Sequence, residues 1–126
     1  MPTVEVKNLT KRFVSGGGSV VDAVKNLSFS VNEGELFTLL GPSGCGKTTT
    51  LRALAGFEDI TEGQIKLFGN VVSTSDLNVP PERRGIGFVF QSYAVWPHMT
   101  ARENNRFAPP DVRSKSAFCW FSVIRI

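Results

Sequence analysis

The chain has 126 residues, enough for one domain at most, and its 41% hydrophobic and 20% charged content is ordinary for a soluble globular protein. The formal net charge of +3 lies wholly in the last 25 residues, because residues 1–101 carry nine basic and nine acidic side chains and residues 102–126 carry five and two. A basic nucleic-acid-binding surface on the body is therefore excluded, and so is a disulfide framework, since the chain has only two cysteines.

The N-terminal third predicts β structure. Apolar spacing predicts a strand from Val4 to Phe13, a glycine-rich loop follows at 15–19, and strict alternation over 27–31 predicts a second strand. After a turn at 32–34, residues 35–40 are almost continuously apolar, which is typical of a strand covered on both faces. No signal peptide and no apolar run of about 18 residues is present, so we expect a cytoplasmic protein, or one held at a membrane by a partner.

A phosphate-binding loop follows this strand. The pattern is Gly41-x-x-x-x-Gly46-Lys47-Thr48, in which backbone N–H groups and a helix N-terminus surround phosphate. Lys47 would reach the β- and γ-phosphates, and the Thr48 hydroxyl would bind Mg²⁺. The alternative is a glycine-rich turn without a ligand. The candidate nucleotide-binding residues of the loop are Gly41, Pro42, Ser43, Gly44, Cys45, Gly46, Lys47, Thr48 and Thr49.

A helix and further strands are expected after the loop. Leu51, Leu54 and Ala55 share one helical face, and Gly56 is placed to end the helix. Residues 63–68 alternate like a strand, and Gly69-Asn70 resembles a hairpin turn into Val71-Val72. After Pro80-Pro81, residues 85–90 predict another strand, which ends at Gln91. The expected fold is α/β, with a strand–loop–helix nucleotide site and an antiparallel β arm.

The chain changes character near residue 106. No glycine occurs after Gly87, and residues 107–126 end in an apolar, β-prone run that would favour aggregation if exposed. We therefore expect residues 1–106 to form one unit and residues 107–126 to be an unmatched tail, either frameshifted or disordered.

Several stretches of the chain together match one known pattern: 9–13, 41–50, 54–56, 62–65, 80–91, 92–100 and 102–104. They resemble the ATP-binding subunit of ABC transporters of the importer type, which use ATP and Mg²⁺. Within that family, the subgroup that imports sugars, polyamines or ferric iron is the most similar. The resemblance implies a P-loop NTPase core of the ABC ATPase type, incomplete at the C-terminus.

The resemblance implies roles for two residues outside the loop. Phe13 matches the aromatic residue that stacks on adenine; its alternative is a core aromatic at a strand end. Gln91 matches the glutamine that touches Mg²⁺ and senses the γ-phosphate, so the implied metal ligands are Thr48 and Gln91. For Gln91, the alternative is a polar residue that caps a strand.

The resemblance also implies partners. Residues Ser92 to Thr100 match the segment that meets the membrane permease, where Trp96 and Met99 would be exposed apolar contacts. Packing on a satellite core is the alternative for both. Family members pair with a second ATP-binding subunit and lie on the inner face of the membrane through the permease; the transported solute is not encoded in these residues.

The single cysteine of the loop and the single histidine receive no catalytic role. Cys45 is interpreted as a small residue tolerated between two glycines of the loop. His98 does not match the switch histidine of the family.

Hydrolysis in this family needs parts that residues 92–126 do not carry. A Ser-Gly-Gly-Gln signature is impossible without glycine, and the two acids after Gln91, Glu103 and Asp111, do not follow an apolar strand. We therefore expect a truncated or frameshifted N-terminal part that binds nucleotide and does not hydrolyse it alone.

Two other interpretations remain open. A small kinase or GTPase would need its own motif, such as Asn-Lys-x-Asp, which does not occur. A non-enzymatic remnant, or a regulatory fragment that binds only nucleotide or the permease, is the second.

Overall fold

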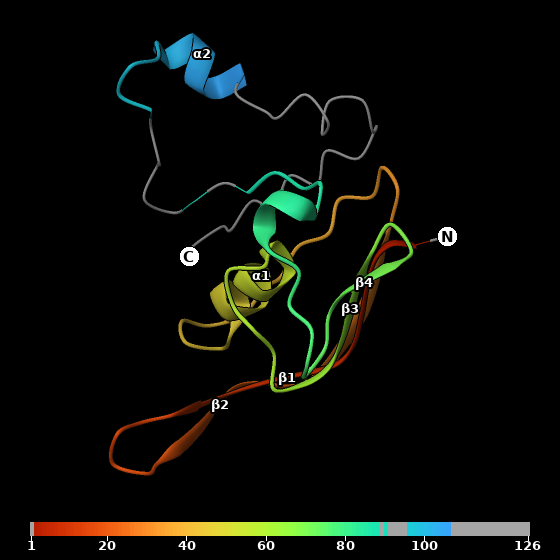
Figure 1. Cartoon of the computed structure of the whole chain (residues 1–126), viewed down its shortest axis with the longest axis vertical. Coiled ribbons are helices and arrows are strands. Elements are labelled where there is room, and N and C mark those ends of the chain that lie inside the picture. Colours follow the sequence, from red (N-terminus) through yellow and green to blue (C-terminus); the bar gives the residue numbers. More distant parts are fainter. Residues whose placement is uncertain (1, 89, 91–95, 107–126) are drawn as a thin grey trace.

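A computed structural model of the protein describes residues 2–88, 90 and 96–106, and the order of its elements is drawn in Figure 1. The strands are β1 (Pro2–Val14), β2 (Val20–Asn32), β3 (Glu62–Leu67) and β4 (Asn70–Ser73), the helices are α1 (Lys47–Ala55) and α2 (Ala101–Arg106), and a 3₁₀ turn spans Pro81–Arg83. No helix within these ranges is long and apolar enough to cross a membrane.

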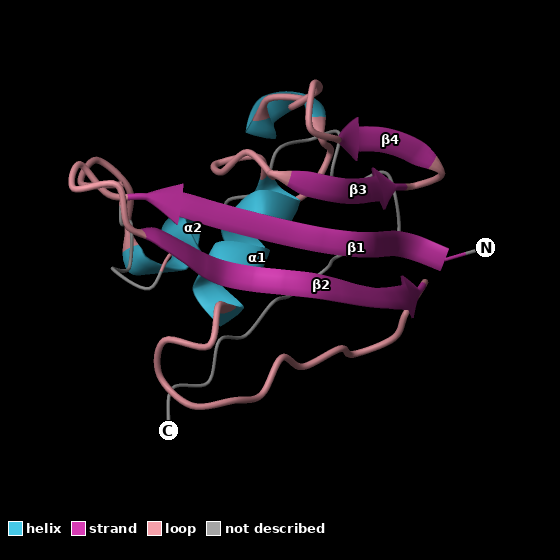
Figure 2. Ribbon diagram, turned by 90° about the horizontal axis from the view of Figure 1, so that it is seen from below, coloured by secondary structure: helices cyan, strands magenta, loops and turns pink. Residues whose placement is uncertain are grey.

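The four strands form one antiparallel sheet in the order β2-β1-β3-β4. Strand β1 lies in the middle and pairs with β2 on one side and β3 on the other, while α1 lies against one face of the sheet (Figure 2). Inward-pointing aliphatic side chains of the strands meet the buried face of α1 and form the core. The core residues are Val4, Val6, Leu9, Val24, Val31, Leu51, Ala53, Leu54, Ile60, Ile65, Leu67 and Val72.

Helix α1 confirms the predicted helix and its end. Its first half contains three threonines, which are weak helix formers, so burial of Leu51 and Leu54 must supply most of its stability. The helix ends at Gly56, which has a left-handed φ of 90° and donates its N–H to the Ala53 carbonyl at 3.2 Å. This conformation strongly favours glycine.

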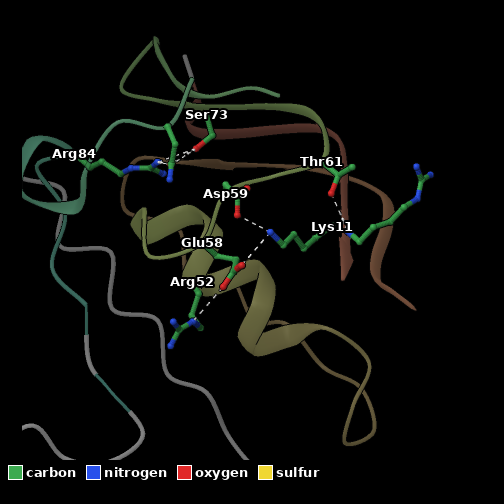
Figure 3. Close-up of polar contacts among 9 residues, drawn as sticks. Lys11, Arg52, Glu58, Asp59, Thr61, Ser73 and Arg84 are labelled. Carbon is green, nitrogen blue, oxygen red and sulfur yellow. Dashed lines mark hydrogen bonds and ion pairs between the residues drawn. The ribbon is translucent and has the colours of Figure 1, made fainter. Parts of the chain in front are cut away.

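Arg84 is the most deeply buried charged side chain of the described residues, at 3% exposure. It donates to the carbonyls of Ala53 and Leu54 at 2.9 Å, in the last turn of α1. It also donates to the carbonyl of Val79 at 2.7 Å. A further bond runs to the hydroxyl of Ser73 at 2.8 Å (Figure 3). Burial lowers the pKa of Arg84 to about 10, so the guanidinium remains charged at neutral pH.

The predicted strand over residues 35–40 is wrong. The side chains of this segment alternate in burial, since Phe37 and Leu39 pack against the core while Leu36 and Leu40 are 80% and 77% exposed. Phe37 stacks on Phe29 of β2, with ring centroids 4.6 Å apart. Within the described part of the chain no strand pairs with this segment, and a strand requires such a neighbour for its backbone hydrogen bonds.

Residues 85–88 and 90 do not form the strand predicted over residues 85–90. Val89 and Gln91 lie outside the described residues. Ile86 and Phe88 pack against the core without a strand partner. As for residues 35–40, an apolar run alone does not supply the neighbouring backbone that a strand needs.

The β3–β4 hairpin turn lies one residue earlier than predicted. Phe68 and Gly69 form the two-residue loop with φ of 51° and 81°, because Leu67 pairs with Asn70. Two positive φ angles are typical of the hairpin turns that fit strand twist. Phe68 packs against the core, and this burial offsets the cost of about 1–2 kcal/mol of a left-handed conformation.

Replacement of Arg84 tests its structural role. We expect Arg84→Met to lower the free energy of unfolding by about 2–4 kcal/mol, because buried carbonyls lose their charged donor. Urea denaturation followed by circular dichroism measures this change. Arg83→Met is the matched control, since Arg83 is exposed, and it should have little effect. Equal effects of the two substitutions would contradict the role of Arg84.

Candidate functional site

The phosphate-binding loop connects segment 35–40 to the first residue of α1. Gly44 and Gly46 have left-handed φ angles of 81° and 91°, and the N–H of Cys45 donates to the carbonyl of Pro42 at 3.3 Å. Gly46 is the N-cap of α1 and no side chain caps the helix. The first N–H groups of α1 have no partner within the helix, so they form an anion-binding terminus.

Lys47 turns its side chain back into the loop. Its ammonium donates to the carbonyl oxygens of Gly41 and Pro42, the latter at 2.8 Å, and lies 3.5 Å from the Cys45 thiol. The positive charge is therefore held at the center of the loop, beside the helix N-terminus. This places two sources of positive potential at one point.

Gly46 also fixes the loop against the sheet. A Cβ at this position would collide with the carbonyl oxygen of Ala23 and lie 3.0 Å from the Val24 side chain, both on β2. The backbone of the loop therefore approaches β2 closely, which only glycine permits. Thr50 strengthens the start of α1 by donating its hydroxyl to the Gly46 carbonyl at 2.8 Å.

A pocket of about 410 Å³ lies between β2 and the loop. Lys25 and Lys47 line it, and so does Asp22, whose carboxylate accepts from Arg12 at 2.9 Å. Because Arg12 neutralises Asp22, the two lysines make the electrostatic potential of the pocket positive. A positive potential favours binding of a polyanion. The lining residues are Asp22, Ala23, Val24, Lys25, Leu27, Leu39, Leu40, Gly44, Cys45, Gly46, Lys47 and Thr50.

Of the two expected metal ligands, Thr48 is the one that lies within the described residues. Thr48 lies exposed in the first turn of α1, whereas Gln91 lies outside the described residues. Where the structure can be described, no three or more His, Cys, Asp or Glu side chains are grouped to hold a metal. A lone hydroxyl at a phosphate-binding loop fits Mg²⁺, which commonly takes few protein ligands and completes its shell with phosphate and water.

Phe13, the expected adenine platform, lies near the end of β1 and is 42% exposed. The ammonium of Lys11 lies 5.0 Å from the ring centroid. Lys11 also pairs with Asp59 at 2.6 Å and with Glu58 at 3.0 Å. Burial alone would lower the pKa of Lys11, but the bonds to Asp59 and Glu58 outweigh burial, so the pKa of Lys11 is raised. The bond from Lys11 in turn lowers the pKa of Asp59.

The described end of the expected permease segment is organised by Asn104. The Asn104 side chain accepts from the N–H of Trp96 at 2.7 Å and donates to the carbonyls of Met99 and Thr100 at 3.0 Å. Trp96 is 48% exposed, and its ring lies edge-on to His98 at 5.8 Å. Residues 92–95 lie outside the described residues.

Glu103 serves as a helix cap. The backbone N–H and the hydroxyl of Thr100 donate to its carboxylate at 2.7 and 2.8 Å, and these bonds lower the pKa of Glu103. The Thr-x-x-Glu spacing is that of a capping box. Glu103 is thus engaged locally, and Asp111 lies outside the described residues.

Lys11 and Arg84 are two residues for which no role is predicted from the sequence. Lys11 contacts Asp59 across 48 positions, and Arg84 contacts Ala53 across 31. The acidic pair Glu58-Asp59, just after the predicted helix, is the local feature that could have indicated a site for a basic partner such as Lys11.

The family described as ABC transporter matches residues 24–124. The spermidine/putrescine import ATP-binding protein PotA of Acidothermus cellulolyticus is 50% identical over 108 residues, which is 86% of this chain and 27% of that protein. PotA of Chromobacterium violaceum is 53% identical over 107 residues, 85% of this chain and 27% of that protein. The chain spans about a quarter of the length of these curated relatives.

Solved structures share the fold. The dimeric ATP-binding cassette MJ0796 bound to ADP and Pi has a TM-score of 0.67 and 36% identity, covering 80% of this chain and 44% of that one. A second dimeric structure of MJ0796, a bacterial ABC transporter cassette, gives a TM-score of 0.67 at 35% identity and the same coverage. The expected fold class, a P-loop core with an antiparallel β arm, is therefore confirmed.

The close approach of the loop to β2 can be tested with two glycines. Gly44→Ala should cost about 1–2 kcal/mol of unfolding free energy, because its left-handed φ is strained but its surroundings are open. Gly46→Ala carries the same strain and a collision with the Ala23 carbonyl, which should add about 1–3 kcal/mol. Urea denaturation of both variants measures the difference. Equal losses would mean that Gly46 does not pack against β2.

Proposed function

The chain belongs to the ABC transporter family, and we propose that it binds ATP with its glycine loop as part of a transporter's ATP-binding component. One observation carries the proposal: the ammonium of Lys47 is held inside a loop that ends at the uncapped N-terminus of α1. A triphosphate is the ligand class that best matches two adjacent positive sources in a pocket of about 410 Å³.

The loop residues from Gly44 onward would have different parts in binding. The N–H groups from Gly44 to Thr49 would donate to phosphate oxygens, and Lys47 would exchange its bonds to the loop carbonyls for bonds to phosphate. Thr48 would be a ligand of Mg²⁺, which neutralises phosphate charge when bound. Phe13 would stack on the base. Cys45 would contribute backbone only.

The substrate of transport is proposed from the relatives. PotA proteins carry the words spermidine/putrescine import in their names, and they match at about half identity over more than four-fifths of this chain. We therefore favour polyamine import over the sugar and ferric-iron alternatives. The chain spans only about a quarter of those proteins. The proposed substrate is therefore that of the whole transporter, of which this chain would be one part.

The proposed partners are a permease and a second ATP-binding subunit. The exposed Trp96 side chain, in a turn fixed by Asn104, supports a protein contact at residues 92–100. The dimeric cassette of similar fold supports pairing of two subunits. Such contacts would hold the chain at the cytoplasmic face of a membrane.

Hydrolysis is proposed to require residues beyond these 126. We take residues 1–106 as the part that carries the loop, with 107–126 as a tail. The signature, the Mg²⁺-holding aspartate and the general base of the family pattern do not occur after Gln91. A full site would need them from elsewhere.

Nucleotide binding is tested by Lys47→Ala. We expect ATP affinity to fall by about 10- to 150-fold, because a charge-assisted contact of about 1.5–3 kcal/mol is removed. Isothermal titration calorimetry with ATP and Mg²⁺ measures it. Lys66→Ala is the matched control: Lys66 lies on β3 between the buried Ile65 and Leu67, so it points away from the face that α1 covers. Equal affinity of wild type and Lys47→Ala would contradict the site.

Turnover is tested on the same 126 residues. We expect no ATPase activity that depends on Lys47, since positioning and electrostatic parts each contribute a few kcal/mol and several are missing. Release of phosphate from wild type and Lys47→Ala measures this. A Lys47-dependent rate of ~1–10 s⁻¹ would overturn the proposal. Activity only after addition of a complete subunit would indicate that the missing parts can be supplied across a dimer.

A further inference from the structure

The Phe13 ring is held from one side by a charge. The Lys11 ammonium lies 5.0 Å from the ring centroid, a distance at which a cation is attracted to an aromatic face. The Phe13 side chain is 42% exposed, so part of it remains open to solvent. An ammonium on one face leaves the other as the surface on which a planar base can stack.

The ammonium is itself anchored. The Lys11 side chain is only 8% exposed, and its nitrogen lies 2.6 Å from an Asp59 carboxylate oxygen and 3.0 Å from a Glu58 oxygen (Figure 3). Glu58 also lies 3.9 Å from Arg52 of α1, so the charges form one chain from helix to ring. With two carboxylates around it, Lys11 stays charged at neutral pH, because its pKa is raised.

These contacts connect the two ends of the proposed nucleotide site. Lys47 lies at the first residue of α1, and Glu58 and Asp59 follow the last turn of the same helix. Lys11 lies on β1, two positions before Phe13. The ion pairs therefore fix the aromatic ring relative to the helix whose other end carries the phosphate-binding lysine.

We propose that Lys11 is a positioning residue for the nucleobase, holding the Phe13 ring in a stacking orientation through its pairs with Asp59 and Glu58. The inference rests on the proposed ATP binding and adds a residue that touches no part of the ligand. Its consequence is specific: Lys11 contributes to binding of the base and not to binding of the phosphates.

Lys11→Met tests this consequence by calorimetry with two ligands. ATP affinity should fall by about two- to fivefold, the range of a partly desolvated cation–ring contact. Affinity for inorganic tripolyphosphate, which has no base, should not change. Equal losses for both ligands, or no loss for ATP, would overturn the proposal. If wild type binds neither ligand, the proposed function fails, which is a separate outcome.

A matched control and a double-mutant cycle separate positioning from a general structural effect. Lys7→Met changes the same residue type on the same strand, at an exposed side chain paired with Glu5, and should leave ATP affinity unchanged. In a Phe13→Leu background, Lys11→Met should reduce ATP affinity no further, because no ring remains to be positioned. A full additional loss in that background would contradict the role.

A milder variant keeps the test available if Lys11→Met does not fold cooperatively. Asp59→Asn loosens the anchor and leaves Lys11 and Phe13 in place, and the Asp59 side chain is 73% exposed, so the fold should tolerate it. We expect about a twofold loss for ATP and none for tripolyphosphate. Unchanged ATP affinity in Asp59→Asn, with wild type binding normally, would overturn the proposal.

Discussion

The Arg84 guanidinium joins parts of the chain that no continuous element connects. Its bonds reach carbonyls in the last turn of α1, in strand β4 and at Val79. Two of these carbonyls, those of Ala53 and Val72, also accept a backbone N–H, so the guanidinium adds a second donor there. A Cβ at Gly56 would lie 2.5 Å from the Arg84 Nε, so the helix end and the arginine exclude any larger residue there. These contacts fix the C-terminal end of α1 to the sheet and so help to set the orientation of the helix.

The front of the same helix carries the candidate site. Close packing of Gly46 on Ala23 fixes the loop against β2, and the buried face of α1 holds the helix on the core. Lys47 and Thr48 then lie at the helix start, while Lys11 connects β1 to the segment after the helix end. A rigid nine-residue helix held at both ends is a suitable support for a phosphate-binding terminus, since its N–H groups cannot turn away.

Local patterns in the sequence predicted the elements that depend on local properties. The spacing of Leu51 and Leu54 and the position of Gly56 gave the helix and its end, and alternation gave β3 within one residue. The strand prediction for residues 35–40 was wrong because an apolar run indicates burial and not the presence of a neighbouring strand. The pairs of Lys11 and Arg84 span tens of residues, and single-chain periodicity carries no information on such distant contacts.

Strand order also sets the order in which the chain can fold. The β1–β2 hairpin closes a short loop, so it can form early, whereas β3 reaches β1 only after residues 33–61 have been closed into one long loop. That long loop contains the phosphate-binding residues and α1. The loop therefore acquires its shape in a late, non-local step, and any slowing of β1–β3 pairing delays the appearance of the entire nucleotide site.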